Sequence, residues 1–394
     1  MQLGWIDFSK NERDKVLGVL ESLTESGTLD ELGIAPIRDG FADLFFPGTS
    51  TLHRHAKYFL IVPYACMDLE RSELPNPNVA YKRLYEIERA SAAILHKANP
   101  QELGIIGVDY INRREWVKRP PSTLYWAGLR RYGIFKGAHS LSEYLKAMCA
   151  LKSDKDTLKK LGSRNDTEDC DDKDAGAMQT VRFFPDLRTY QPNWKEKLTV
   201  RLTKKEAEYL KDKIKRAAPD SLLVHLLNSK KDDILKCDSF EALSELVDDK
   251  KLKADCDMAI AFSNFLYVLR VVYNIVISQG ENESANKIIS ELQHDLKRYA
   301  DIDIDAIFLR LDIFNRGLKS FLDESKREMA AGNIDALKTI VAKRERSIKQ
   351  GRAKTLNPLP EYADKWIGGK QLDYRFTQAK QLIKDIFDGE ASDV

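Results

Sequence analysis

The sequence predicts a mainly α-helical protein with many helices arranged in two domains. Apolar residues recur three and four positions apart through most of the chain, as at Val16, Leu20 and Leu23, and this is the spacing of a buried helix face. The capping-box pattern S-x-x-E at Ser9 and Glu12 stands just before that run and marks a helix N-terminus. With 394 residues the chain is long enough for more than one hydrophobic core.

In the first 152 residues the expected helices follow one another between proline and glycine turns. Pro36 suits the first turn of one helix, Gly133 suits the end of another, and Pro63 is expected to kink or split a third. Short apolar runs at 105–108 and 199–202 are candidate strands, a minor β component. The expected helices lie at 9–27, 36–46, 49–61, 80–97, 120–133 and 140–151.

The predicted domains 1–152 and 179–394 are separated by an acidic linker or loop at 153–178. Residues 165–176 contain six acids and one base, with no aromatic residue, so this stretch is too polar to form a packed core. In the second domain, which carries a basic tail region, a capping box at 203–206 opens the first helix. Its expected helices lie at 203–217, 220–228, 239–248, 255–279, 283–299, 304–324, 333–350 and 374–387.

Charge and cysteine usage are typical of a cytoplasmic protein. Lys and Arg number 63 against 61 Asp and Glu, a net charge of +2, which excludes a global electrostatic attraction to nucleic acid or membrane. Five cysteines without a C-x-x-C pair indicate reduced thiols rather than disulfides or zinc. The start of the chain lacks a signal-peptide pattern. The most apolar stretch, 258–277, contains Arg270 and is expected to be a buried helix, not a membrane span.

The sequence contains no recognised catalytic, nucleotide-binding or metal-binding motif. His53 and His55 stand two residues apart, whereas a chelating pair on a helix needs a spacing of four. We therefore expect no metal and no cofactor, and we favour a binding role over an enzymatic one. A helical nuclease or other hydrolase is the alternative. Arg89 and His96 have the spacing of the Arg–His pair in HEPN ribonucleases, although Ala90 replaces the polar residue usual after that arginine.

Two local clusters of basic residues are the candidate binding sites. The first, from 113 to 137, holds seven bases against Glu115 and is interleaved with aromatic residues such as Trp116 and Trp126. A turn followed by a short helix with arginines near its end resembles a small helix-turn-helix or winged-helix element. The alternative is a core helix whose aromatic side chains pack inward. The candidate phosphate-binding residues here are Arg113, Arg114, Lys118, Arg119, Arg130 and Arg131.

The second cluster, from 343 to 384, holds eleven bases against four acids, a net charge of +7. Such a cluster can bind phosphates with an affinity that falls as salt increases. It can equally contact the acidic residues 165–176 or a protein partner, or form ordinary solvated surface. The candidate phosphate-binding residues here are Lys343, Arg344, Arg346, Lys349 and Arg352.

Several segments together resemble a bacterial family of unknown function. The most specific are the G-W-I-D-F-S start at 4–9 and the F-P-G-T-S-T motif at 46–51, while Phe376 stands where the family is expected to have Trp. The resemblance implies an association with anti-phage defence gene clusters, beside helicases and nucleases, and brings no active site with it. The other matching segments are 31–39, 41–45, 121–129, 202–203, 206–210, 344–345 and 372–375.

Taken with the setting that the resemblance implies, these observations predict an accessory subunit of a bacterial anti-phage defence system. We expect it to bind nucleic acid, or to bridge proteins in a complex, by contacting phosphates through the two basic clusters. The expected partners are DNA or RNA and other protein subunits such as a helicase or nuclease, with no membrane. Besides the nuclease, a purely structural protein–protein scaffold is the remaining alternative.

Overall fold

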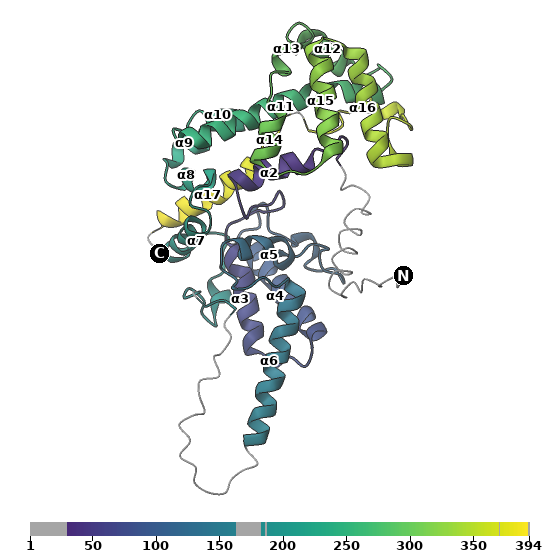
Figure 1. Cartoon of the computed structure of the whole chain (residues 1–394). Coiled ribbons are helices and arrows are strands. Elements are labelled where there is room, and N and C mark those ends of the chain that lie inside the picture. Colours follow the sequence, from purple (N-terminus) through teal and green to yellow (C-terminus); the bar gives the residue numbers. More distant parts are fainter. Residues whose placement is uncertain (1–29, 163–182, 186, 370, 393–394) are drawn as a thin grey trace, which may run out of the picture. The chain divides into compact units, whose positions relative to one another are not determined.

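Helices and the turns between them form the whole of the described structure (Figure 1), and no strand occurs within it. The mainly α-helical prediction is therefore confirmed. The helix expected at 9–27 and the acidic stretch at 165–176 lie outside the described residues. The computed structural model describes residues 30–162, 183–185, 187–369 and 371–392.

Both expected strands are wrong. Residues 105–108 form turns that lead into the short 3-10 helix η1 (Val108–Tyr110), and 199–202 form a bent segment that precedes a helix. A short apolar run becomes a strand only when a second strand pairs with its backbone, and the described ranges contain none. Ile105 and Leu202 are buried all the same, so their apolar character reflects burial and not strand formation.

Two compact units make up the described chain, and both are discontinuous in sequence. Unit 1 contains residues 30–41 and Asp248–Tyr374, and unit 2 contains Ala42–Val247 and Arg375–Val394. These boundaries differ from the expected division at 153–178. The reason is that α17 (Phe376–Glu390) packs against helices from the middle of the chain, foremost α7 (Lys204–Ala217).

Unit 2 takes most of its helices from the first 250 residues. Helix α3 (Tyr58–Arg71) is its central element and packs against both α4 (Pro77–Ala98) and α5 (Pro121–Arg131). Pro63 lies inside α3, is buried, and does not split the helix. The remaining helices assigned here are α6 (Leu141–Gly162), α8 (Leu222–Leu227), α9 (Lys231–Lys236), α10 (Phe240–Ser244) and the end of α2 (Ala35–Phe45).

A buried ion pair joins α7 to the start of α3. Lys57 and Glu206 are both buried, and Nζ of the lysine lies 2.6 Å from Oε2 of the glutamate. The same carboxylate accepts hydrogen bonds from the backbone N–H of Thr203 at 2.8 Å and from the hydroxyl of Tyr64 at 3.1 Å. The capping box predicted at Thr203 and Glu206 is confirmed, and its glutamate also serves as an anchor within the core.

A second buried acid joins α4 to the first turn of α5. Glu88 is buried, and its Oε1 accepts a hydrogen bond of 2.6 Å from the backbone N–H of Ser122. Burial raises the pKa of Glu88 to about 7, and the hydrogen bonds from Ser122 offset only part of that increase. This carboxyl group therefore titrates near neutral pH.

Unit 1 is organised around one long apolar helix, α11 (Lys250–Ile277). Among the described residues it alone is long and apolar enough to span a membrane, yet 67% of its most apolar window is buried inside the protein, as expected for a core helix. Both α12 (Glu283–Leu292) and α16 (Ile334–Lys349) pack against it. The other α-helices of unit 1 are α13 (Leu296–Tyr299), α14 (Ile304–Arg310) and α15 (Arg316–Ala330).

The single helix predicted at 304–324 is in fact two helices, α14 and α15. The break occurs at 311–315, where Asp312 has a positive φ of 52°. Asn315 then caps α15, because its side chain accepts a hydrogen bond of 2.9 Å from the backbone N–H of Leu318. The apolar spacing alone did not reveal this interruption.

Unit 1 also contains a fully buried carboxylate, that of Glu345 in α16. It accepts hydrogen bonds from the hydroxyl of Tyr273 at 2.7 Å and from the backbone N–H groups of Lys354 and Thr355 at 3.2 and 2.9 Å. The ammonium group of Lys349 lies 3.6 Å away. These contacts join α11, α16 and the turn after α16 at one point.

Replacing Glu88 with glutamine is expected to remove a pH dependence of stability. Because the pKa of Glu88 is raised from 4.5 to about 7, its contribution is fully present below pH 4.5 and is lost as pH rises through the folded pKa. The wild type should therefore lose about 3 kcal/mol of unfolding free energy by about pH 8, relative to Glu88→Gln. Urea unfolding at several pH values measures this.

The matched control is Glu86→Gln, which changes an exposed acid of the same helix. Its pH profile should follow that of the wild type. If Glu88→Gln also follows the wild type, burial does not shift the Glu88 carboxyl as described.

Candidate binding pocket and basic surface around α5

A cavity of about 370 Å³ in unit 2 is lined by the 47–50 loop and by α5. The loop lies within the F-P-G-T-S-T motif that carries the family resemblance. The cavity wall combines glycine backbone with hydroxyl, imidazole, carboxylate and guanidinium groups, which is the mixture of a polar ligand site. The lining residues that matter below are Asp43, Gly48, Ser50, His53, Gly128 and Arg131.

The loop approaches α5 so closely that two glycines are required. Gly48 has a φ of +80°, and a Cβ there would lie 2.7 Å from the ring of Tyr132. A Cβ at Gly128, on α5, would lie 2.5 Å from the carbonyl oxygen of Gly48. The Tyr132 hydroxyl adds a hydrogen bond of 2.9 Å to the carbonyl oxygen of Pro47. Only glycine permits this approach of two backbones.

Arg375, which precedes α17, holds the same loop from another side. Its Nη1 donates to the carbonyl oxygen of Thr49 at 3.0 Å and to Oδ1 of Asp43 at 2.5 Å. The φ of Arg375 is +69°, in the left-handed region that residues other than glycine rarely adopt. Such a conformation persists where surrounding contacts enforce it, and these two hydrogen bonds are contacts of that kind.

His53 is buried in the pocket wall and stacks on Tyr125, with ring centroids 4.1 Å apart. Its Nε2 lies 3.1 Å from the carbonyl oxygen of Leu124, and since a carbonyl only accepts, Nε2 carries the proton. Nδ1 is buried without a hydrogen-bond partner among the described residues. Burial, assisted by the charge of Arg375, lowers the pKa of His53 to about 4. The ring is therefore neutral at physiological pH, and Nδ1 is an acceptor.

His53 and His55 do not converge on one point. Nε2 of His55 lies 2.8 Å from the carbonyl oxygen of Leu103, and its Nδ1 lies 3.8 Å from Oδ2 of Asp385. Nowhere in the described ranges do three or more His, Cys, Asp or Glu side chains gather as metal ligands would. The two histidines instead fasten their segment to different neighbours.

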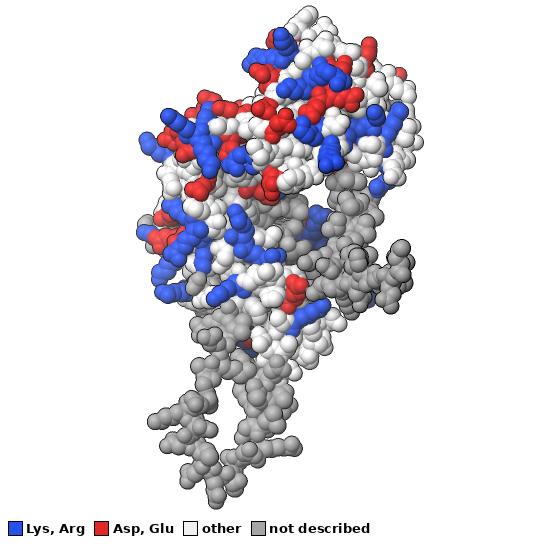
Figure 2. All heavy atoms as spheres, in the orientation of Figure 1, with Lys and Arg blue, Asp and Glu red and all other residues white. Residues whose placement is uncertain are grey.

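The first basic cluster lies on the protein surface at both ends of α5. On α5 itself Tyr125, Trp126 and Leu129 are buried, whereas Arg130 and Arg131 are exposed. The aromatic side chains thus pack inward and leave the arginines to solvent. Figure 2 shows basic side chains predominating around α5 and α7, while unit 1 carries both signs of charge. All six candidate residues are exposed, namely Arg113, Arg114, Lys118, Arg119, Arg130 and Arg131.

A compact helix-turn-helix is not formed around α5. Such a motif joins its helices by about three or four residues, whereas residues 99–120 separate α4 from α5 and residues 132–140 separate α5 from α6. A winged helix also needs strands, and none occurs in the described part of the chain. The resemblance to this motif arose from the turn and the arginines alone.

Helix α7 adds Lys213 to the basic surface around α5, and the sequence did not predict this addition. Nζ of Lys213 lies 3.3 Å from the carbonyl oxygen of Gly133, just after α5. A contact between residues 80 positions apart leaves no local signal in the sequence, although the excess of Lys and Arg in α7 is visible there. We define the α5 basic surface as Arg113, Arg114, Lys118, Arg119, Arg130, Arg131, Lys136 and Lys213.

Two of the five candidate residues in the second basic cluster make contacts inside unit 1. Nε of Arg344 donates to the carbonyl oxygen of Leu32 at 2.9 Å, and Lys349 lies 3.4 Å from the carboxylate of Glu31. These contacts hold both side chains against residues 31–32 within unit 1, so they are less accessible to a ligand. The other three candidates are exposed, namely Lys343, Arg346 and Arg352.

Arg89, half of the Arg–His pair of the nuclease alternative, has a structural role. Its guanidinium lies over the ring of Trp116, 5.5 Å from the centroid, and Nη2 donates to the carbonyl oxygen of Arg114 at 3.5 Å. These contacts hold the segment before α5 against α4.

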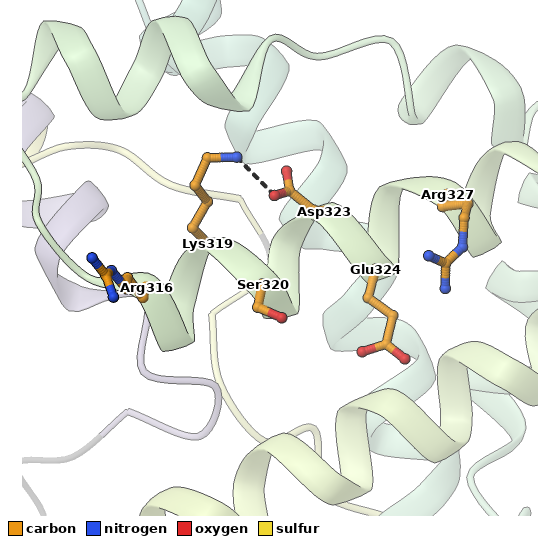
Figure 3. A pocket seen from close by; sticks show the side chains of 6 residues that line it. All are labelled: Arg316, Lys319, Ser320, Asp323, Glu324 and Arg327. Carbon is orange, nitrogen blue, oxygen red and sulfur yellow. Dashed lines mark hydrogen bonds and ion pairs between the residues drawn. The ribbon is translucent and has the colours of Figure 1, made fainter.

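A cavity of about 520 Å³ in unit 1 is an open groove along α15 (Figure 3). All of its lining side chains belong to this one helix, where two bases are followed by a serine, two acids and a third base. Lys319, for example, is paired with Asp323 at 2.7 Å. Paired charges on a single helix face do not converge on a ligand. The groove is lined by Arg316, Lys319, Ser320, Asp323, Glu324 and Arg327.

The comparisons with known proteins concern the part of the chain that forms most of the pocket. Residues 1–180 match a family of unknown function (DUF6361). The matched part includes the 47–50 loop, His53 and α5, whereas Lys213 and Arg375 lie beyond it. The match describes no activity and shows no link to anti-phage defence. No curated protein and no solved structure matches the chain.

The substitution Gly128→Ala is expected to destabilise the protein. Its methyl group would meet the backbone of Gly48 at 2.5 Å, and overpacking of this kind costs about 1–3 kcal/mol. Chemical unfolding followed by circular dichroism measures the loss. The matched control is Gly351→Ala, because that glycine is exposed and a Cβ there meets nothing within 4 Å. Equal stability of the two variants would contradict the close approach of the loop to α5.

Proposed function

We propose that the protein binds nucleic acid by contacting phosphates through the α5 basic surface. One observation carries the proposal. Between residues 113 and 136 the exposed side chains include seven bases and only one acid, Glu115. Phosphate contacts by lysine and arginine supply most of the affinity for nucleic acid, and they are independent of base sequence.

The arrangement of these bases suits an extended, negatively charged chain. The two groups of arginines flank α5, whose eleven residues span about 16 Å. A distance of that size covers several successive phosphates of a strand. The whole protein is nearly neutral, so the attraction is local to this surface and does not extend over the molecule.

The pocket and the basic surface share Arg131, which lines the cavity and belongs to the exposed set. A strand held on the surface by its phosphates therefore has one of its units beside the pocket. This continuity supports a binding role for unit 2 and makes the second basic cluster, two of whose five candidates make contacts inside unit 1, the weaker candidate.

The proposal includes an accessory role in the cytoplasm, beside a helicase or nuclease that supplies the chemistry. The family resemblance supports an anti-phage defence system as the setting. A protein-bridging scaffold is the second candidate, and it is favoured by two side chains of unit 1, Leu309 and Phe314, which are 84% and 92% exposed. Apolar side chains this exposed are typical of protein contact sites.

Binding of short DNA and RNA strands should weaken steeply as salt rises from about 50 to about 200 mM. The double substitution Arg130→Gln/Arg131→Gln is expected to weaken binding of all strands and to lower the slope of log affinity against log salt by about 2, one for each lost phosphate contact. Filter binding at several salt concentrations measures both effects.

The matched control is Lys343→Gln/Arg346→Gln, which removes two exposed bases of the second cluster. This variant should bind like the wild type. If it weakens binding while Arg130→Gln/Arg131→Gln does not, the phosphates contact unit 1 instead. If no strand binds at any salt concentration, the scaffold replaces the proposed function.

A further inference from the structure

The pocket beside the α5 basic surface combines a cation with a buried acceptor, and a ribonucleotide can satisfy both. We propose that it binds one ribonucleotide unit of a single strand, with the phosphate at Arg131 and the ribose 2′-hydroxyl donating to Nδ1 of His53. The protein would then distinguish RNA from DNA. This inference rests on the proposed function, because the strand must first be held by its phosphates.

His53 provides the reason to expect a hydroxyl donor. Its Nε2 is committed to the carbonyl oxygen of Leu124, and its Nδ1 has no partner among the described residues. A buried acceptor without a donor is unfavourable, and a ligand hydroxyl removes that deficit. The stack on Tyr125 and the contact with Leu124 hold the ring in one orientation at the cavity. Its lowered pKa keeps the ring neutral, and Nδ1 remains an acceptor at neutral pH.

Arg131 and Ser50 provide the reason to expect a phosphate. Arg131 is exposed at the cavity, and its guanidinium matches the geometry of phosphate oxygens. The Ser50 oxygen accepts from the backbone N–H of Leu52 at 3.3 Å, which leaves its proton for a phosphate oxygen. Asp43 also lines the cavity, but its charge is compensated by Arg375.

The size of the cavity limits the ligand to a single unit. Its 370 Å³ lies at the lower end of the range of about 300–1,000 Å³ for small-molecule sites. A base pair in a duplex cannot enter such a space, whereas a nucleotide of a single strand can turn toward it. The 2′-hydroxyl is the one group that separates a ribonucleotide from a deoxyribonucleotide at a given site.

The test compares three single strands of one sequence, namely RNA, 2′-O-methyl RNA and DNA, by fluorescence anisotropy. The wild type should bind RNA about fivefold to tenfold more tightly than the other two, the ratio that corresponds to one hydrogen bond. DNA removes the hydroxyl without adding bulk, and 2′-O-methyl RNA removes the donor while keeping the oxygen. Weaker binding of both therefore identifies the lost donor as the cause.

The variant His53→Phe keeps a ring to stack on Tyr125 and removes the acceptor. It should bind the three strands equally, at the affinity that the wild type shows for DNA. Arg131→Gln should weaken all three strands in proportion and leave the ratios unchanged. A purely structural role of His53 would change affinity for every strand and would not change the ratios.

The two proposals fail in different ways. If the wild type binds all three strands equally, with a steep salt dependence, the pocket inference is overturned and the proposed function stands. If no strand binds, both are overturned. Because the comparison of strands needs only the wild type, failure of His53→Phe to fold does not prevent the decision.

Discussion

A carboxylate removed from water is costly unless donors surround it, and each unit of this protein contains a buried glutamate with several donors around it. In unit 2 Glu206 takes its donors from Lys57, from Tyr64 and from the capping position of α7. In unit 1 Glu345 takes them from α11 and from the turn that follows α16. Three of these donors, Lys57, Tyr64 and Tyr273, are distant in sequence from the glutamate that they contact. Satisfying the charge therefore fixes which segments meet, and the apolar packing follows the same arrangement.

In unit 2 the pocket depends on the contacts that surround Glu206. Lys57 ends the segment that carries His53, so its ion pair with α7 sets where the imidazole lies. The loop before His53 is then pressed on α5 through Gly48 and Gly128 and is held from another side by Arg375. Two regions of the chain thus line the cavity, and a third supports the loop from outside it. The left-handed conformation of Arg375 is maintained by the contacts that provide this support.

Much of the fold could be predicted from the sequence because helices leave a local signal. The apolar spacing, the capping box at 203–206 and the buried helix within 258–277 all appear in the structure. The expectations that differ from the structure have a common cause. Strands, unit boundaries and the break at 311–315 depend on distant partners or on turns, and the spacing of apolar residues reports neither. Exposure of Arg130 and Arg131 followed from the helical pattern of α5. The contacts of Arg344 and Lys349 could not be predicted in this way, because their partners lie more than 300 residues away.

The order of the chain has a consequence for biosynthesis. Unit 2 begins at Ala42, yet it is completed by residues that follow all of unit 1, including Arg375 and α17. The ribosome therefore synthesises the 47–50 loop and α5 long before it reaches Arg375, whose side chain holds the loop. Until then Asp43 lacks the guanidinium group with which it pairs in the folded protein, and Thr49 lacks its hydrogen-bond donor. The loop therefore gains its last support only after all of unit 1 has been synthesised.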